Sequence, residues 1–441
     1  MTNFGAYHRT SIAKTISGER VSRSNVSNVR KSGLTAGLLM ALHLVRERST
    51  LRALLVGVLA TVLVFATACS TDKSTEPEAP PSQHVIKRLD PALAAKLDAA
   101  IADTIKKANI PGAIVGITGP DGTYVHTAGV ADKATGAPMK ADFYGRIGSV
   151  TKTFTVTGIL QLVGDGKIGL DDPISKYISG VPEGDKVTIR MLARMQSGLP
   201  DYSENDEFIK LFLSDHNHVF TPQQLLDFAW TSPMQFAPGT NWKYTNVNLI
   251  LLGMVLEKVS GQKIQDYIGE HILKPLGLKH TIFPTNADFP DPHAQGYTVQ
   301  DESGNETIST NWNPSWGWAA GAMISNLDDL EIWAPALAKG TLLKPEVQAQ
   351  RMQMVSALHL PAPDGYGLGI FNVGGWIGHN GSLPGYETVV TYLPEKDITM
   401  IMLINTDEQY GELEPSTALA QAVTQVLTPD HVYNLAAAAQ N

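Results

Sequence analysis

The chain has 441 residues, of which 43% are hydrophobic and 17% charged, and its formal net charge at pH 7 is −9. This balance suits a folded protein with a large core, and it argues against binding to nucleic acid or to anionic lipid through a basic patch. Because Cys69 is the only cysteine, the chain cannot form an internal disulfide.

The first 68 residues have the pattern of a secretory signal. Residues 1–52 carry nine Lys or Arg and two acidic residues, and an uncharged, mostly apolar run follows over residues 53–65. Small residues then lead to Cys69. A basic segment, a short apolar segment and small residues predict export, since a membrane-spanning helix needs roughly 20 apolar residues. The basic segment is long, and Met40 would begin a signal of more usual length.

The position of Cys69 resembles the lipobox of bacterial lipoproteins, although Ala66 stands where leucine is usual. The resemblance implies a lipid on Cys69 that anchors the protein at the extracytoplasmic face of a membrane. The alternative is an unpaired thiol without a function. Residues 69–84 are rich in Pro, Glu, Ser and Thr and predict a flexible tether. Loss of residues 1–68, with nine basic and two acidic residues, would leave a net charge of −16, so lipid rather than a basic patch would hold the protein.

Residues 85–428 are long enough for one large domain with two lobes. Apolar residues at helical spacing predict a helix over residues 90–109. Strand pairs around the turn signals at 120–122 and 394–397 predict two hairpins. A closing helix is predicted over residues 416–427. Mostly helical patterns fill the middle of the domain, roughly residues 149–290, and the clearest cover residues 149–163, 221–230 and 246–259.

Strands at both ends of the domain with helices between them predict an α/β fold. We expect an antiparallel sheet flanked by helices, with an inserted, mostly helical lobe and a functional site in the cleft between the two. Residues 429–441 are predicted to form a disordered tail.

Three short motifs follow one another along this domain. Ser149 and Lys152 are three residues apart, so that on a helix they face the same side. The pattern alone is weak, because it recurs at Ser11, Ser70 and Ser260. Ser149 is distinguished from these other serines by the two motifs that follow it in the domain, Tyr244-Thr245-Asn246 and His379-Asn380-Gly381. They contain the only tyrosine with Asn two residues later and the only histidine with Gly two residues later.

Each motif residue has an ordinary and a chemical interpretation. Ser149 could cap a helix, or its hydroxyl could be a nucleophile if Lys152 is shielded enough to accept its proton. Tyr244 could be a half-buried aromatic or a proton relay, and Asn246 a helix cap or a partner of Lys152. The motif at His379 could be a turn entering a strand. In the chemical interpretation Gly381 lets the backbone approach a substrate, and the N–H groups of two serines, Ser149 and Ser382, form an oxyanion hole.

The ordered set resembles the serine β-lactamase-like family, which includes D-alanyl-D-alanine carboxypeptidases, class C β-lactamases and esterases. Flanking segments over residues 88–428 are similar as well, among them Met195–Pro200 and Gly365–Gly369. The resemblance implies a β-lactamase/transpeptidase-like fold and no cofactor. It also implies that Ser149 is acylated, with Lys152 as its base, Tyr244 transferring protons and Asn246 beside them. The oxyanion-hole amides would be those of Ser149 and Ser382.

Further residues enter through the same resemblance. His379 would lie near the substrate carboxylate or the leaving group, where many relatives have Lys, and Trp316 and Phe208 would line the cleft. The chain departs from similar carboxypeptidases in having Ile370-Phe371-Asn372-Val373 where they carry arginines. A guanidinium is the natural clamp for a terminal carboxylate, so this departure favours an esterase or a broader peptidase. The other histidines have no ligand-like spacing, and no metal is implied.

The leading hypothesis is therefore an exported serine hydrolase, a penicillin-binding, carboxypeptidase-like enzyme acting on D-amino-acid peptides. An esterase or a β-lactamase of the same fold is the first alternative, and the substrate would be a cell-wall peptide, an ester or a β-lactam. The alternative from another class is a lipoprotein that binds wall peptides without turnover. The intact set of Ser149, Lys152 and Tyr244 argues against that binder.

Overall fold

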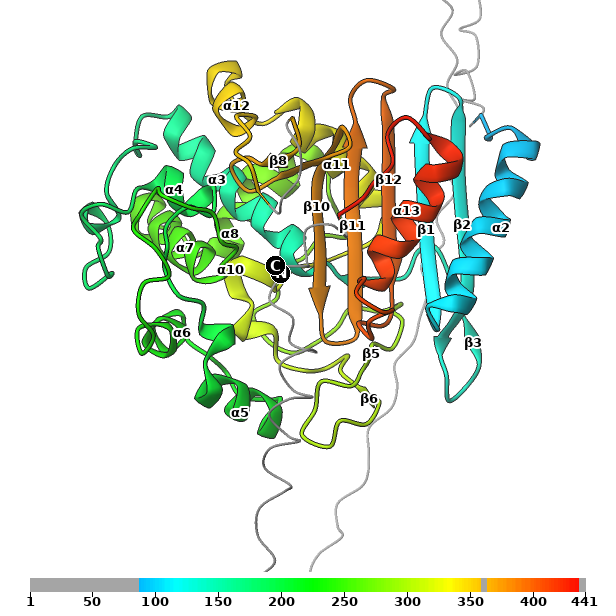
Figure 1. Ribbon diagram of the computed structural model, residues 1–441, viewed down its shortest axis with the longest axis horizontal. Helices are drawn as coiled ribbons and strands as arrows, with labels where there is room; N and C mark the ends of the chain where they lie inside the picture. Colours follow the sequence, from blue (N-terminus) through cyan, green and yellow to red (C-terminus); the bar gives the residue numbers. More distant parts are fainter. Residues whose placement is uncertain (1–86, 358–362, 436–441) are drawn as a thin grey trace, which may run out of the picture. The chain divides into compact units, whose positions relative to one another are not determined.

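The computed structural model describes residues 87–357 and 363–435 (Figure 1). The predicted signal, the tether and Cys69 lie outside the described residues, as do residues 436–441 at the end of the predicted tail. Within the described ranges no helix combines the length and the apolar character that crossing a membrane requires.

One eight-stranded sheet organises the domain, with strand order β3-β2-β1-β12-β11-β10-β9-β8 and antiparallel pairing throughout. The central strands come from the two ends of the domain, since β1 pairs with β12. The strands are β1 Gly112–Gly119, β2 Gly122–Asp132, β3 Ala137–Pro138, β8 Gly365–Tyr366, β9 Phe371–Val373, β10 Trp376–Leu383, β11 Tyr386–Leu393 and β12 Ile398–Ile404. Two short strand pairs lie outside this sheet, β4 Gly145–Arg146 with β7 Ile324–Ser325 and β5 Tyr297–Thr298 with β6 Thr307–Ile308.

Helices cover both faces of the sheet. α2 (Pro91–Lys107) and α13 (Pro415–Leu427) lie side by side on one face (Figure 1). The Tyr124 hydroxyl of β2 donates to Asp98 of α2 at 2.7 Å. α11 (Leu327–Lys339) packs on the opposite face, where Leu327 crowds Gly116 of β1. Neighbouring residues of a strand point to opposite faces of the sheet. Because helices cover both faces, the side chains on both sides of the central strands are buried.

The remaining helices form the inserted region beside the sheet. α3 and α7 are at its centre and are buried on nearly all sides, which explains why their sequences are apolar all round. The helices are α3 Thr151–Gly164, α4 Ile189–Ala193, α5 Asp206–Ser214, α6 Pro222–Ala229, α7 Val247–Ser260, α8 Ile264–Ile268, α9 Lys274–Leu276, α10 Trp318–Gly321 and α12 Pro345–Arg351. Short 3₁₀ turns are η1 Gly148–Val150, η2 Ile174–Lys176, η3 Tyr202–Glu204 and η5 Pro314–Trp316, and η4 Gly269–Leu273 is a π-helix.

The predicted fold class is confirmed, and so are the predicted hairpins and the first and last helices. One of the two interpretations left open for a motif is wrong, and so is one expectation. The motif from His379 to Ser382 is not a turn but lies inside strand β10, paired with β11. Residues 429–435 do not continue as a free tail, because Tyr433 is buried and its N–H donates to Thr424 at 2.9 Å. The folded domain therefore extends past residue 428.

The buried acid Glu387 of β11, which accepts a hydrogen bond from Ser416 at the start of α13, predicts a pH-dependent stability. Burial, together with the charge of Glu414, raises the pKa of Glu387 well above its usual value. The folded state keeps a proton that the unfolded chain releases above about pH 4, so the free energy of unfolding should fall as the pH rises. Glu387→Gln should shrink the drop in melting temperature between pH 5.5 and 8 by at least about 2 °C. Glu302→Gln, at an exposed carboxyl, is the control, and equal drops in the two variants would contradict the prediction.

Candidate active site

Ser149 and Lys152 meet where the strand region joins the helical region. Ser149 lies in η1, one turn before α3, rather than in the α-helix itself. The Lys152 Nζ is 2.9 Å from the Ser149 Oγ. The turn depends on Gly148, whose φ of +49° lies in the left-handed region that favours glycine. The sequence pattern thus brings an amine into hydrogen-bond contact with a hydroxyl that stays partly exposed.

Three oxygens surround the amine of Lys152. Besides Ser149, its Nζ contacts the Asn246 Oδ1 at 2.9 Å and the Ala320 carbonyl at 2.7 Å. The side chain is 0% exposed, and burial lowers its pKa to about 7, against the opposing charge of Asp201. A neutral amine has two N–H groups and one lone pair. If the two N–H groups bind Asn246 and Ala320, the lone pair faces the Ser149 hydroxyl.

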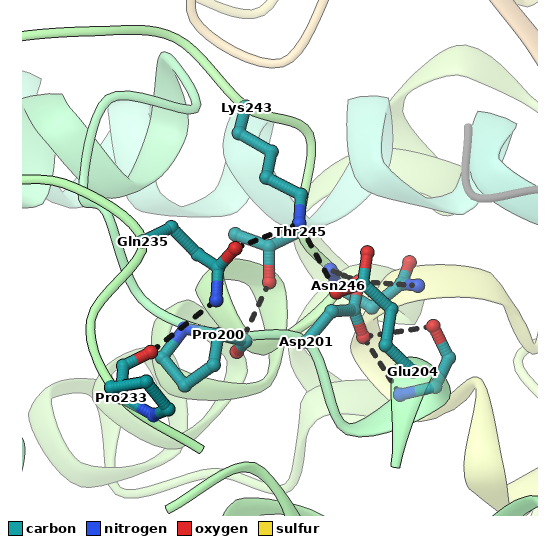
Figure 2. Close-up of polar contacts among 9 residues, drawn as sticks. Pro200, Asp201, Glu204, Pro233, Gln235, Lys243, Thr245 and Asn246 are labelled. Carbon is teal, nitrogen blue, oxygen red and sulfur yellow. Dashed lines mark hydrogen bonds and ion pairs between the residues drawn. The ribbon is translucent and has the colours of Figure 1, made fainter. Parts of the chain in front are cut away.

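Asn246 begins α7 and is held by Asp201, which precedes η3 (Figure 2). The Asp201 Oδ2 accepts the Asn246 backbone N–H at 2.7 Å and its side-chain Nδ2 at 3.2 Å. Beside them, Lys243 pairs with Glu204 at 3.1 Å (Figure 2). Sequence reasoning missed Asp201, because nothing local distinguishes it from other acidic loop residues.

Tyr244 is buried against this group. The Lys152 Nζ lies 4.9 Å from the centre of its ring, and among the described residues its hydroxyl makes no hydrogen bond of ordinary geometry. Burial raises its pKa well above the usual value, with Tyr366 adding to the effect and the nearby Ser149 hydroxyl opposing it. Tyr244 is therefore a neutral phenol that holds its proton, whereas Lys152 can exist as a neutral base near pH 7.

His379 lies on β10 and is fully buried among rings of Tyr244, Tyr366 and Phe371. Its Nδ1 is 2.5 Å from the Asn380 carbonyl and its Nε2 is 3.3 Å from the Tyr366 hydroxyl. This network assigns the proton to Nδ1, with Nε2 accepting from Tyr366. Burial, followed by the charge of Lys152, lowers the pKa of His379 to about 3. The imidazole is thus neutral and adds no positive charge to the site.

Strand β10 runs directly against the turn of Ser149. A Cβ added to Gly381 would lie 2.0 Å from the Ile147 carbonyl oxygen and 2.9 Å from the Ser149 N, and one added to Gly148 would lie 2.7 Å from the Ser382 N. The two glycines therefore allow two backbones to touch, where we had expected an approach to substrate. The backbone nitrogens of Ser149 and Ser382 are consequently close together at the partly exposed edge of the group.

The two expected aromatic residues lie in different surroundings. Phe208 is 0% exposed and packs among Tyr202, Phe212 and other rings, so its side chain does not line an open cleft. Trp316 is half-buried, and its carbonyl accepts from Tyr202 at 2.6 Å. Phe212 lies between the two, 5.1 Å from Trp316. Phe208 is therefore a packing residue behind Trp316. The sequence pattern could not distinguish such a buried aromatic residue from one that lines the cleft.

No group of three or more His, Cys, Asp or Glu side chains in the described part of the chain is arranged to hold a metal ion. The chemical groups that meet at Ser149 are a hydroxyl, an amine, a phenol, an amide, an imidazole and backbone N–H groups.

Known proteins resemble this chain over most of its described length. Protein flp from Staphylococcus aureus (strain MW2) is 26% identical over 326 residues, which cover 71% of this chain and 64% of that protein. The chain thus spans less than two thirds of the length of this relative. Penicillin-binding protein 4* from Bacillus subtilis (strain 168) is 26% identical over 343 residues, 73% of each chain. The solved structure of D-amino acid amidase from Ochrobactrum anthropi SV3 with D-phenylalanine matches with a TM-score of 0.69 and 26% identity, over 77% of this chain and 99% of the amidase.

A sequence model of the family described as Beta-lactamase matches residues 97–424, well over half of the chain. The family match, the antiparallel sheet, the inserted helical region and the structural match above all indicate the same fold. The chain belongs to the β-lactamase family and has its serine β-lactamase-like fold.

Proposed function

We propose that this protein is a serine hydrolase that forms an acyl-enzyme on Ser149. The observation that supports this most directly is the environment of Lys152, a buried amine with a pKa of about 7 that contacts the Ser149 hydroxyl at 2.9 Å. A nucleophilic serine needs a neighbouring base that is neutral near the working pH. Lys152 meets this requirement, and Tyr244, which holds its proton, does not.

The acylation step follows from these positions. The Ser149 Oγ attacks the substrate carbonyl carbon while its proton passes to the lone pair of Lys152. The negative charge that develops on the carbonyl oxygen is stabilised by the backbone N–H groups of Ser149 and Ser382. As the carbon–nitrogen or carbon–oxygen bond breaks, the leaving group takes a proton from Lys152 through the Tyr244 hydroxyl. Water then attacks the carbonyl carbon of the ester, the bond from that carbon to the Ser149 Oγ breaks, and a proton from the water returns to the Oγ as the acid is released.

We further propose that the preferred substrates are amides, esters or peptides of D-amino acids that have no carboxylate beside the leaving group. His379 is neutral, and Ile370 and β9 supply no guanidinium. Lys243 is paired with Glu204, and Arg146 is 4% exposed and donates from its Nη2 to the carbonyls of Thr310 and Trp312. A desolvated carboxylate without a cation is costly, so a free C-terminus would bind poorly.

The similarity to D-amino acid amidase supports the proposed preference for substrates built from D-amino acids. The same argument makes a strict carboxypeptidase the weaker alternative, and benzylpenicillin, which carries a carboxylate, should acylate Ser149 only slowly. An esterase remains the second candidate, because an ester without a carboxylate fits the same neutral surroundings.

A matched pair of dipeptides tests the proposal. D-alanyl-D-alaninamide and D-alanyl-D-alanine share the peptide bond between their two residues and differ in the terminal group. Cleavage of that peptide bond is followed as release of D-alaninamide or D-alanine, separately from ammonia released at the terminal amide. We expect kcat/KM to be at least about tenfold higher for the amide, with both activities lost in Ser149→Ala and with the L,L compounds as stereochemical controls. A preference for the free carboxylate would contradict the substrate class. Hydrolysis of p-nitrophenyl acetate without either dipeptide would favour the esterase.

The neutral state of His379 predicts how this preference depends on pH. Since its pKa is lowered to about 3, the imidazole stays uncharged from pH 5 to 7. The ratio of kcat/KM for the amide to that for the free acid should therefore stay constant within about twofold over this range. A histidine that became charged near pH 6 would favour the acid as the pH falls. Such a trend would contradict the neutral assignment.

Export and lipid attachment remain part of the proposal. The residues concerned, including Cys69, lie outside the described ones, so they depend on the sequence pattern alone. A Cys69→Ala variant that stayed in the membrane fraction after expression of the full chain would contradict the predicted anchor.

A further inference from the structure

Asp201 is a buried carboxylate beside the site that the acylation step above does not use. It is 3% exposed, and its oxygens accept four hydrogen bonds. Oδ1 accepts the backbone N–H and the hydroxyl of Ser203, each at 3.0 Å, and Oδ2 accepts the backbone N–H and side chain of Asn246. The carboxylate is thus anchored on one side by its own loop and faces α7 on the other.

This contact determines the orientation of the Asn246 amide. Its Nδ2 faces the Asp201 Oδ2 at 3.2 Å, so its Oδ1 faces Lys152, at 2.9 Å (Asp201 and Asn246 in Figure 2). A reversed amide would place its carbonyl against the carboxylate and its NH₂ against the N–H groups of Lys152. The contact with the carboxylate would be repulsive, because acceptor would face acceptor, and Lys152 would lose the acceptor of one of its N–H groups.

The amide orientation in turn directs the lone pair of Lys152. With Asn246 Oδ1 and the Ala320 carbonyl as acceptors, both N–H groups of the neutral amine are engaged. The lone pair is then left for the Ser149 hydroxyl at 2.9 Å. If Asn246 presented its NH₂ instead, the lone pair would bind that group and turn away from Ser149.

We propose that Asp201 is a positioning residue of this site: by fixing the Asn246 amide, it turns the lone pair of Lys152 onto the Ser149 hydroxyl. The role rests on the acylation of Ser149 proposed above. Asp201 hydrogen-bonds Ser203 and Asn246 rather than Ser149 or Lys152, so it acts through Asn246 and Lys152.

Asp201 also acts on Lys152 through its charge. Around the amine, Tyr244 and His379 are neutral, and Glu204 is paired with Lys243. Asp201 is the group whose charge raises the pKa of Lys152 against the effect of burial. Removing that charge should let the pKa of Lys152 fall, so a larger fraction of the amine would be neutral at low pH.

Acylation by p-nitrophenyl acetate between pH 5.5 and 9 tests the proposal with the full domain. In Asp201→Asn, the plateau rate at high pH should fall about 10- to 100-fold, with KM changed less than about threefold. The ratio of the rate at pH 6 to that at pH 8 should rise at least about threefold over the wild type. Asp201→Glu keeps the negative charge but lengthens the side chain. The plateau rate should therefore fall, while the ratio of the rates at pH 6 and pH 8 should stay as in the wild type.

Asp329→Asn is the matched control. Asp329 is equally buried and accepts from Lys279, His280 and Thr281, and it makes no hydrogen bond to the group around Ser149. This variant should lose stability but keep the plateau within about twofold and the wild-type pH ratio. The same rate loss in both variants, or an unchanged plateau and ratio in Asp201→Asn, would overturn the proposal. If Asp201→Asn does not fold, a wild-type plateau in Asp201→Glu would overturn it.

A second measurement does not depend on turnover. The titration of Lys152, followed by NMR of ¹³C-labelled lysine and assigned with Lys152→Met, should move to lower pH in Asp201→Asn. This shift can be observed even if no ester or amide is hydrolysed. Absence of hydrolysis with the shift present would contradict the proposed function alone, whereas an unmoved titration would contradict the role of Asp201.

Discussion

Replacing Lys152 with methionine should lower the rate of Ser149 acylation about 10³-fold, yet it should not lower the melting temperature at pH 7. Methionine is of similar length but has no lone pair on nitrogen, so the Ser149 proton loses its acceptor. The stability expectation follows from burial. The pKa of this lysine falls from its ordinary value of 10.5 to about 7 in the folded state.

The difference between the folded-state and unfolded-state pKa of Lys152 determines how stability depends on pH. Below pH 10.5 the unfolded chain holds a proton on Lys152 that the folded state releases, so the folded state loses stability as the pH falls towards 7. The full cost is roughly 5 kcal/mol for a pKa lowered from 10.5 to about 7, and the loss of the three hydrogen bonds of Lys152 offsets part of the gain from removing it. The stability of Lys152→Met relative to the wild type should therefore be higher at pH 7 than at pH 9.5.

Burst kinetics with an activated ester and thermal melts at pH 7 and 9.5 check both parts. Ser149→Ala sets the floor for acylation, and Lys167→Met, at an exposed lysine, is the matched control that should leave both quantities unchanged. An acylation rate of Lys152→Met within tenfold of the wild-type rate would show that Lys152 is not the base. A relative stability that did not depend on pH would contradict the lowered pKa.

Local signals account for the elements that could be predicted from the sequence. The first helix begins where Asp90 caps two backbone N–H groups and Pro91 fixes the first turn, and α7 ends at Gly261, whose φ is +73°. The hairpin between β1 and β2 forms around Gly122, whose φ of +136° suits glycine. These features need only neighbouring residues, so a single sequence contains them.

The site could be predicted only in part, because many of its contacts join residues that are far apart in the chain. The motif residues Ser149, Lys152, Tyr244 and Asn246 do come together. The Ala320 carbonyl, however, is 168 residues from Lys152, and a backbone oxygen has no signature in a sequence. Asp201 and the fully buried Phe208 differ from other loop acids and cleft aromatics only in their packing.

The charge of His379 is a second property of the site that could not be predicted from the sequence. A histidine in this position could carry a proton and bind a carboxylate, or stay neutral and reject one. The surrounding Tyr366 and Phe371 exclude water from it, and Lys152 disfavours a second positive charge. Lys152 lies in a different part of the chain from Tyr366 and Phe371, so the charge of His379 follows from tertiary structure rather than from the motif.

Adding one methyl group in Gly381→Ala should lower kcat for any accepted substrate about 10²- to 10³-fold. The φ of Gly381 is not in the left-handed region, so its backbone conformation suits alanine. The new Cβ, however, would lie 2.0 Å from the Ile147 carbonyl oxygen. Strand β10 would have to move away from the turn of Ser149, and the N–H groups of Ser149 and Ser382 would no longer converge on one oxygen.

Gly112→Ala separates this effect from a loss of stability. Its Cβ would meet the Val130 carbonyl at 2.4 Å, a similar backbone clash between β1 and β2, away from Ser149. Both variants should lose about 1–3 kcal/mol of stability, but Gly112→Ala should keep kcat within about threefold of the wild type. Equal losses of kcat in the two variants would mean that general loosening of the sheet, and not the geometry of the two N–H groups, limits the reaction. Wild-type kcat in Gly381→Ala would exclude the Ser382 N–H from the oxyanion hole, because the strand that carries it cannot stay in place.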